Sequence, residues 1–166
     1  MLLLAFCIIT ICFTLFKLSP CCNKTKKRRP SKDQEGRPLC AVVTGYSSGI
    51  GLATVKALYK DTNLKIIGID VVEVDGGGIF KGLGTTSNIN TRFMGFKCDV
   101  TKDIELKKVY ETLVTKGFVV DAIICCAGIT RTGPLMEINA NQIQKVMDIN
   151  VMGVHRCIRT FFGRKI

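Results

Sequence analysis

Short apolar runs alternate with amphipathic stretches from residue 39 to the end of the sequence. The apolar runs are six to ten residues long and mostly rich in valine and isoleucine, as expected of buried strands. Between and after these runs, apolar residues recur at helical spacing, which indicates helices with one buried face. The pattern predicts strands over residues 39–44, 64–70, 93–100 and 119–128, and helices over residues 49–60, 102–117 and 142–162.

The order of these elements predicts the fold class. Strands that alternate with helices form βαβ units, whose strands run parallel and whose crossovers are right-handed. We therefore expect an α/β domain with a doubly wound, Rossmann-like parallel sheet. The strand over 119–128 is apolar at nearly every position, which is typical of a strand covered on both faces. The segment 75–90 is rich in Gly, Ser, Thr and Asn, and is expected to be a mobile loop.

The first 22 residues form a separate apolar segment. Residues 2–16 carry no charge, and extension to Cys22 adds only Lys17, whose long stem can reach the membrane surface. About 21 residues make roughly 31 Å of helix, close to the thickness of a bilayer's hydrocarbon core. A cleaved signal peptide and a buried core helix are alternatives. The first needs a positive charge before the apolar run and a small-residue cleavage site after it, and neither is clear here. The second would not be expected directly before a basic cluster. We expect residues 1–22 to be a transmembrane signal anchor.

Positive charge is concentrated directly after this segment. Residues 1–38 hold eight basic and two acidic residues, in a chain whose net charge is +11. We expect residues 23–38 to be a basic juxtamembrane linker that faces anionic lipid and leaves the rest of the chain in the cytosol. Cys21 and Cys22 lie beside the membrane, where they are either palmitoylated or unmodified. The sequence shows no nucleic-acid-binding motif, so nucleic acid is not an expected partner.

Composition excludes several other classes of protein. The 166 residues are 47% apolar and 22% charged, which suits one folded domain rather than a disordered or low-complexity chain. The nine cysteines are an odd number without CxxC spacing, and His155 is the single histidine. We therefore expect reduced thiols, no disulfide framework and no metal site.

The turn after the first predicted strand carries the strongest chemical signal. Its sequence is VVTGYSSGIG over residues 42–51, between a strand and a helix. Gly45 permits a tight turn, Gly49 lets the backbone approach a pyrophosphate, and Gly51 lets the helix pack close to the sheet. The start of the helix offers N–H groups and the positive end of its dipole to an anion. The residues expected to bind a dinucleotide here are Gly45, Ser47, Ser48, Gly49, Ile50 and Gly51.

Asp70 ends the second predicted strand, nineteen residues after Gly51. At this position an acidic side chain accepts a hydrogen bond from a ribose 2′-hydroxyl, and it repels the 2′-phosphate of NADP. No lysine or arginine lies within residues 45–51 to offset that repulsion. NAD is therefore the expected cofactor. The alternatives are a glycine-rich turn without a ligand and an Asp70 that only caps its strand.

The order of four short motifs resembles one family. The stretch TGYSSGIG is similar to the TGxxxGxG fingerprint of the short-chain dehydrogenases/reductases. The motifs CDVT over 98–101, CCAG over 125–128 and INVMG over 149–153 follow in the family's order. The first stretch and the segment 133–138 look similar to the 17β-hydroxysteroid dehydrogenase and retinol dehydrogenase branch. The resemblance covers residues 39–166.

The resemblance implies a role for each of these motifs. Asp99 and Val100 would flank the adenine, and Asn150 would support the catalytic water relay. Cysteines stand where the family has both asparagines of its NNAG motif. Because a thiol hydrogen-bonds weakly, we expect this turn to support the sheet and the cofactor less firmly. The residues that would lie beside the cofactor after the fourth strand are Cys126, Ala127 and Gly128.

The resemblance also implies chemistry that this sequence does not contain. Family members continue beyond the helix of Asn150 with a catalytic Ser and then a Tyr-x-x-x-Lys motif, whose tyrosine moves the proton. The tyrosines here are Tyr46, Tyr59 and Tyr110, and none is followed by lysine four residues later. We expect residues 39–166 to be a partial, C-terminally truncated NAD-binding Rossmann domain whose fourth strand is partly uncovered.

Two hypotheses about function follow. In the first, the chain is the N-terminal portion of a membrane-anchored, NAD(H)-dependent dehydrogenase that acts on a hydroxyl or carbonyl of a lipophilic, retinoid- or steroid-like substrate. The 166-residue chain itself is then expected to be inactive. In the second, it is a non-catalytic, membrane-tethered nucleotide-binding module that pairs with another chain. The anchor and the resemblance suggest the endoplasmic reticulum membrane, with a homodimer as the expected self-association.

Overall fold

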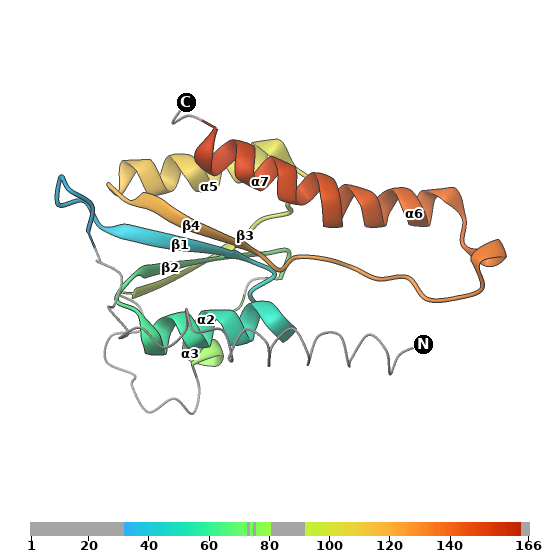
Figure 1. Cartoon of the computed structure of the whole chain (residues 1–166), viewed down its shortest axis with the longest axis horizontal. Helices are drawn as coiled ribbons and strands as arrows, with labels where there is room; N and C mark the ends of the chain where they lie inside the picture. The colour runs from blue at the N-terminus through green and yellow to red at the C-terminus, as the bar shows by residue number, and fades with distance from the viewer. Residues whose placement is uncertain (1–31, 73, 75, 81–91, 164–166) are drawn as a thin grey trace, which may run out of the picture.

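In the part of the chain that the structure describes, four parallel strands form one sheet in the order β3-β2-β1-β4 (Figure 1). The computed structural model describes residues 32–72, 74, 76–80 and 92–163. The strand order reverses beside β1, so the carboxyl ends of β1 and β4 border a topological switch point. The strands are β1 (Leu39–Thr44), β2 (Lys65–Asp70), β3 (Phe93–Lys97) and β4 (Val119–Cys125).

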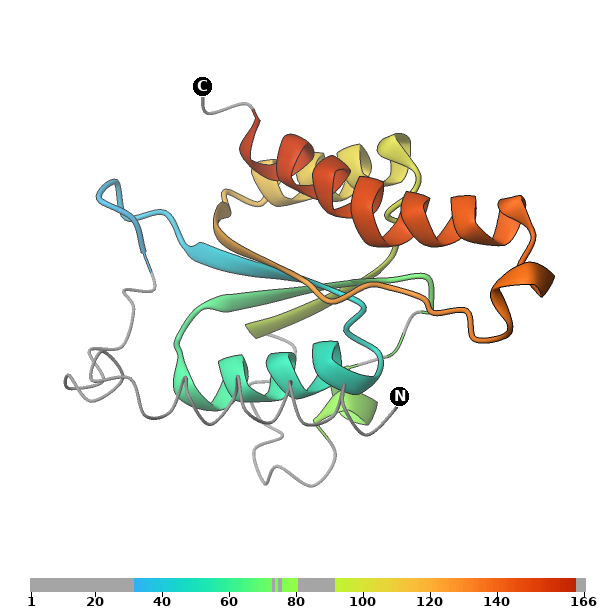
Figure 2. The ribbon, with the colours of Figure 1, turned by 45° about the vertical axis from the view of Figure 1, so that its right-hand side comes forward.

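Helices cover both faces of this sheet (Figures 1 and 2). The predicted doubly wound, Rossmann-like parallel sheet is confirmed. One face carries α2 (Gly49–Asp61) and the short α3 (Gly76–Ile79), and the other carries α5 (Asp103–Thr115) and α7 (Gly153–Phe162). A 3-10 turn, η2 (Leu135–Glu137), precedes α6 (Ala140–Met147), which continues into α7 through a π-helical turn, η3 (Asp148–Met152).

Some predicted bounds differ from the observed ones. The strands β3 and β4 each end three residues earlier than predicted, because the chain leaves the ladder before the apolar run ends. The last helix begins two residues earlier, because Asn139 caps it and Gln142 completes a capping box. The segment 75–90, predicted as a loop, contains the helix α3. Residues 75 and 81–90 of that segment lie outside the described residues.

The amino-terminal predictions fall largely outside the described residues. These include the predicted anchor over residues 1–22, with both candidate palmitoylation sites, and the linker up to residue 31. Within the described ranges, no helix is long and apolar enough to cross a membrane. The end of the predicted linker folds as a tight turn, in which the Asp33 carboxylate accepts the N–H and the guanidinium of Arg37.

The core is divided between the two faces because successive side chains of β1 point to opposite sides of the sheet. All six residues of β1 are buried. Cys40 and Val42 pack with residues of α5 and α7, whereas Val43 packs with Val55 and Tyr59 of α2. A strand this apolar is stabilised between two helical layers, which explains its place inside the sheet.

The strand β4 lies at the edge of the sheet among the described residues and pairs with β1 alone. Of its seven residues, Val120 is buried and most others are half-buried. Its side chains pack on both faces, as predicted, with Ile123 against the cluster of α5 and α7 and Ile124 against the clusters on the other face. The apolar run does not reveal that the strand has a single neighbour among the described residues. The partly uncovered strand expected from the family resemblance is observed.

Tyr46 joins the turn after β1 to the strands β2 and β3. Its side chain is fully buried, with its ring against Gly68 of β2 and its hydroxyl against Gly95 of β3. The two glycines are register partners, so together they leave a slot that the tyrosine fills. The Tyr46 hydroxyl accepts the N–H of Val74 at 3.0 Å and donates to the carbonyl of the same residue at 3.2 Å. This side chain therefore fixes the segment that follows β2.

Substitution of the two glycines of the slot should depend differently on the Tyr46 hydroxyl. A Cβ on Gly68 would lie 2.6–2.9 Å from ring carbons of Tyr46, whereas a Cβ on Gly95 would lie 2.7 Å from the tyrosine oxygen. Each alanine substitution should lower the free energy of unfolding by about 1–3 kcal/mol. In a Tyr46→Phe background, urea unfolding should show that Gly95→Ala loses most of this effect and Gly68→Ala keeps it. Equal effects of Gly95→Ala in both backgrounds would contradict the packing.

Candidate functional site

A pocket of about 410 Å³ lies where the carboxyl ends of β1, β2 and β4 meet the start of α2. All of the residues predicted to contact the cofactor line it, namely Gly45, Ser47, Ser48, Gly49, Ile50, Gly51, Asp70, Asp99, Val100, Cys126, Ala127 and Gly128. Sequence reasoning missed the remaining lining residues, which are Ile69, Val71, Val72, Cys98, Ile129 and Ile149. Five of these six directly adjoin a predicted residue or Asn150 along the chain, and Val72 lies two residues after Asp70, so proximity in sequence is the signal that could have found them.

The glycines of the turn serve distinct purposes. Gly45 has a φ of +68°, and a Cβ there would lie 2.8–2.9 Å from backbone atoms of Cys126 and Ala127. It therefore lets the segment after β4 approach the turn. A Cβ on Gly51 would collide with the carbonyl of Gly45, so this glycine lets the turn fold back on itself. Since Gly51 belongs to α2 and Gly45 directly follows β1, this glycine allows the start of the helix to lie close to the end of the strand.

Gly49 borders open space at the start of α2. Its φ is +52°, and no atom lies within 4 Å of the place where a Cβ would stand. Ser48 is the N-cap of α2 and makes no side-chain capping hydrogen bond. The first N–H groups of a helix lack intrahelical partners, and they carry the positive end of the dipole. This part of the pocket suits an anion such as a pyrophosphate.

Asp70 is held at the pocket by the turn itself. Its Oδ2 accepts the N–H of Ser47 at 3.1 Å and the Ser47 hydroxyl at 2.7 Å, while Oδ1 accepts the N–H of Val72 at 3.2 Å. A carboxylate has about four acceptor positions, so one on Oδ1 is left for a ligand hydroxyl. Ser47 lines the pocket as well, and its hydroxyl is already donated to Asp70.

Thr44 ties the end of β1 to the segment after β4. The side chain is only 1% exposed, and its hydroxyl oxygen accepts the N–H groups of Cys126 and Ala127, at 3.1 and 3.0 Å. The hydroxyl thereby satisfies two backbone donors that no strand neighbour takes up. The expected weakness of a turn with cysteines in place of asparagines is therefore offset, because the support comes from Thr44 and from backbone groups.

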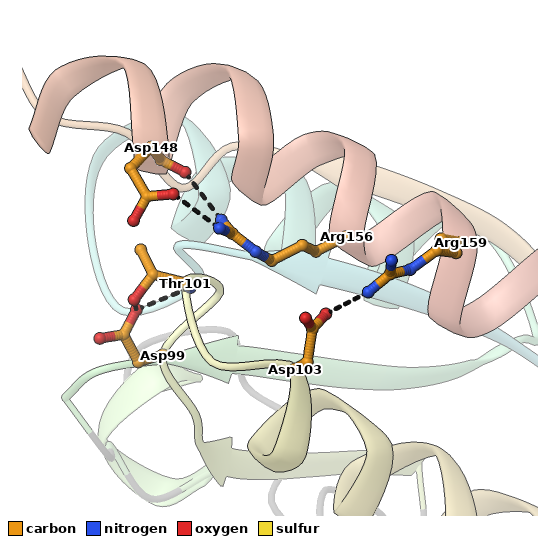
Figure 3. Close-up of polar contacts among 6 residues, drawn as sticks. All are labelled: Asp99, Thr101, Asp103, Asp148, Arg156 and Arg159. Atoms are coloured by element: carbon orange, nitrogen blue, oxygen red, sulfur yellow. Dashed lines mark hydrogen bonds and ion pairs between the residues drawn. The ribbon is translucent and has the colours of Figure 1, made fainter. Parts of the chain in front are cut away.

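The segment after β3 is fixed by short-range bonds. The Asp99 carboxylate accepts both the N–H and the hydroxyl of Thr101, each at 2.9 Å (Figure 3). The Asp99 N–H donates to the Glu105 carboxylate at 2.8 Å. Val100 is buried, and a Cβ on Gly153 would lie 2.8 Å from its methyl carbon. Gly153 thus allows the start of α7 to lie directly over this wall of the pocket.

Asn150 acts on the pocket through a neighbour. It lies in η3 and does not itself line the pocket. Its Oδ1 accepts the N–H of Ile129, and its Nδ2 donates to the Ile129 carbonyl, both at 2.9 Å. The amide therefore holds the strand-like segment that carries Gly128 and Ile129 beside the pocket. This is a positioning contact, and the catalytic role implied by the resemblance stays a prediction.

Two ion pairs hold the helix of Asn150 in place (Figure 3). Arg156 of α7 reaches back to Asp148 of η3, at 2.7 Å to the carboxylate and 3.2 Å to the carbonyl. Arg159 of α7 pairs with Asp103 at the start of α5, also at 2.7 Å. The second pair is more than half exposed, so it contributes less than the first.

The pocket combines acidic groups with neutral thiols. Asp70 and Asp99 are its charged lining residues, and no lysine or arginine of the described chain lines it. Burial raises the pKa of the Cys98 thiol to about 12, helped by the Glu105 and Asp99 carboxylates. Burial also raises the pKa of Cys126, against a lowering hydrogen bond from Thr54. Both thiols are therefore uncharged at neutral pH and act as small apolar walls.

Comparison with known proteins assigns this arrangement. The profile of the short chain dehydrogenase family matches residues 39–164, which span the whole sheet and the pocket. The chain belongs to this family. A short chain aldehyde dehydrogenase of Euphorbia lathyris is 29% identical over 82% of this chain and 44% of its own length. A farnesol dehydrogenase of Aedes aegypti is 33% identical over 70% of this chain and 47% of its own length.

Solved structures of short-chain dehydrogenases share the fold. A putative short-chain dehydrogenase from Novosphingobium aromaticivorans superimposes with a TM-score of 0.64 at 23% identity, and the match covers 76% of this chain and 46% of that one. The aldohexose dehydrogenase of Thermoplasma acidophilum gives a TM-score of 0.59 at 19% identity. This chain therefore spans less than half the length of the short-chain dehydrogenases it matches.

Thr44 should be the most sensitive polar residue of the site. Thr44→Val keeps the shape but leaves two N–H groups without an acceptor, which should lower the free energy of unfolding by about 1–3 kcal/mol. Thr44→Ser keeps the acceptor and loses one methyl group, for about 0.8 kcal/mol. Urea unfolding of both variants checks the order. A serine variant less stable than the valine variant would show that packing, not the hydrogen bonds, sets the role of Thr44.

Proposed function

We propose that this chain is the NAD-binding, N-terminal part of a membrane-anchored short-chain dehydrogenase that acts on a hydroxyl or carbonyl group of a lipophilic molecule. One observation carries the proposal: the glycine turn, the start of α2 and the Asp70 carboxylate share one pocket at the switch point of the sheet. This is the place at which doubly wound sheets bind dinucleotides.

The residues of the pocket fit the parts of a dinucleotide. The open space at Gly49 and the N–H groups of the first turn of α2 would hold the pyrophosphate. The remaining acceptor position on Asp70 would take a ribose hydroxyl. Asp99 and the buried Val100 would flank the adenine. When bound, the nicotinamide supplies hydride chemistry.

The charge of the pocket favours NAD over NADP. The Asp70 carboxylate would lie beside the 2′-position of the ribose, where a phosphate group would be repelled. No basic side chain among the described lining residues would compensate for that repulsion. Ser47 holds the carboxylate toward the turn, so the repulsive charge cannot swing away freely.

These residues do not supply a tyrosine for proton transfer. Transfer of hydride to or from a carbonyl needs a proton donor or acceptor at the oxygen. Tyr46 is buried in its slot, Tyr59 packs on Phe80 and Tyr110 packs on Phe161, so none of them lines the pocket. We therefore propose that the 166-residue chain binds the cofactor without turning over an alcohol. The catalytic tyrosine and lysine would belong to sequence that these residues do not include.

The substrate class and the location are supported by the sequence. The uncharged residues 2–16 and the basic cluster after them favour a membrane anchor with the domain in the cytosol. An enzyme at a membrane, here that of the endoplasmic reticulum, meets lipophilic alcohols, and one relative is a farnesol dehydrogenase. A retinoid- or steroid-like substrate rests on the resemblance of residues 44–52 and 133–138 to that branch. A homodimer is part of the same proposal.

The alternative is a non-catalytic nucleotide-binding module on a membrane. One observation favours this alternative. The described residues form a complete lining for the pocket, but no tyrosine is among them. Sequencing of the transcript past the codon of Ile166 separates the two. A reading frame that continues into a Ser and a Tyr-x-x-x-Lys motif supports the dehydrogenase, and a reproducible stop codon supports the module.

Titration calorimetry with NADH and NADPH tests the cofactor. The full chain should bind NADH more tightly than NADPH. Asp70→Ala removes the ribose acceptor and the repulsive charge, so NADH affinity should fall roughly tenfold, about 1.4 kcal/mol, and the preference over NADPH should shrink.

Ser47→Ala is the matched control for this substitution. It removes the shortest hydrogen bond to Asp70 but leaves the carboxylate and the backbone N–H in place. NADH affinity should fall less than in Asp70→Ala, and the discrimination against NADPH should persist. If Asp70→Ala and the unchanged chain give equal affinities for both nucleotides, Asp70 has no part in cofactor binding.

A further inference from the structure

Two thiols meet behind the cofactor pocket. Cys125 is the last residue of β4, and Cys157 lies in α7, which packs over that strand. Cys125 packs against the core cluster that contains Cys157, so the two thiols lie close together across the boundary between sheet and helix. Both border one narrow gap, which is also lined by Thr44, Val100, Ala127, Ile149, Gly153 and Val154. Neither thiol has a role in the proposed binding of a dinucleotide.

The two thiols differ in their access to solvent. Cys157 is only 1% exposed and belongs to the core cluster between the sheet and α5 and α7. Cys125 is half-buried and packs against that cluster from the partly uncovered strand. A small oxidant therefore reaches Cys125 first, and Cys157 lies directly behind it.

A hydrogen bond between the two thiols shifts their pKa values in opposite directions. It lowers the pKa of Cys125 to about 7, although burial opposes this, and it raises the pKa of Cys157, with burial acting in the same direction. Near neutral pH, a large fraction of Cys125 is therefore thiolate, while Cys157 stays protonated. The thiolate is the nucleophilic form of cysteine, so Cys125 is the reactive partner. Cys98 and Cys126, whose pKa values are raised by burial, stay protonated.

We propose that Cys125 and Cys157 are a peroxide-sensitive thiol pair, and that their oxidation to a disulfide links β4 to α7. The oxidant is a hydroperoxide, with hydrogen peroxide as the simplest case. The pair is specific to this chain's sequence at the end of β4, where the family resemblance would place asparagines.

The chemistry balances in two steps. The Cys125 thiolate attacks one oxygen of hydrogen peroxide, the O–O bond breaks, and hydroxide leaves as Cys125 becomes a sulfenic acid. The Cys157 sulfur then attacks the Cys125 sulfur and displaces the sulfenic oxygen as hydroxide. The two hydroxides become water by taking up two protons. One proton is released from the Cys157 thiol, and the other comes from the solvent, which received a proton when Cys125 ionised. Overall, two thiols and one hydrogen peroxide give one disulfide and two waters.

The position of the pair connects it to the pocket. Val100, Ala127 and Ile149 line both the gap between the thiols and the dinucleotide pocket. The absent Cβ of Gly153 already lets α7 approach the wall at Val100. A covalent link would fix the start of α7 to the end of β4 at this place. The proposal does not depend on the cofactor, since it rests on the two thiols alone.

Peptide mapping of the full chain tests the proposal. The reduced chain is treated with hydrogen peroxide at pH 7.5, its remaining thiols are alkylated, and the tryptic peptides are analysed by mass spectrometry. The expected product is peptide 117–131 joined to peptide 157–159, lost on reduction with dithiothreitol. Its rate of formation should fall about eightfold between pH 7.5 and pH 6, because the fraction of Cys125 thiolate falls with a pKa near 7.

Matched serine variants assign the sulfurs. Cys126→Ser keeps the pair and should still give the linked peptides, which places the bond on Cys125. Cys125→Ser and Cys157→Ser should abolish it, and Cys98→Ser should leave it unchanged. A bond between Cys125 and Cys126, a sulfinic acid on Cys125 without a link, or oxidation of Cys98 at the same rate would overturn the proposal. The mapping of the unchanged chain decides the matter even where a variant fails to fold.

Discussion

The buried hydroxyl of Thr44 holds together the edge on which the pocket is built. By accepting the N–H groups of Cys126 and Ala127, it brings the segment after β4 against the turn after β1. Gly45 can then lie against these two residues, and the Asn150 amide can form its two hydrogen bonds with the Ile129 backbone further along the same segment. Because β4 is an edge strand among the described residues, its end would be free to separate from β1 without this contact, and the pocket would lose one wall.

A second set of contacts fixes the opposite wall. Tyr46 passes from the turn into the slot of Gly68 and Gly95 and holds Val74, while Ser47 holds Asp70. Residues at the end of β1 and in the turn after it therefore connect the strands. Thr44 connects β1 to β4, Tyr46 reaches β2 and β3, and Ser47 binds the end of β2. The glycines make this possible because they remove the side chains that would block each approach. The residues that connect the strands also form the pocket, so the geometry of the pocket is set by the fold.

The sequence was sufficient to predict the fold and most of the lining of the pocket, because both depend largely on local patterns. Alternation of strands and helices predicts the parallel sheet, and three glycines between a strand and a helix predict the turn. Contacts between distant segments were not predictable in this way. Nothing in the local pattern shows that Tyr46 is buried, that the Ser47 hydroxyl binds Asp70, or that Cys125 meets Cys157. The neighbours of β4 depend on partners that its own apolar run cannot indicate.

The central claim is that the carboxyl edge of β1, β2 and β4 is a preformed dinucleotide pocket, and hydrogen–deuterium exchange with and without saturating NADH tests it most directly. Exchange should become slower in peptides that cover residues 45–52 and 126–131, where backbone groups line the pocket. Exchange in the middle of α5, which lies on one face of the sheet and does not line the pocket, should stay the same. Unchanged exchange around the turn, or an equal slowing throughout the chain, would contradict the account.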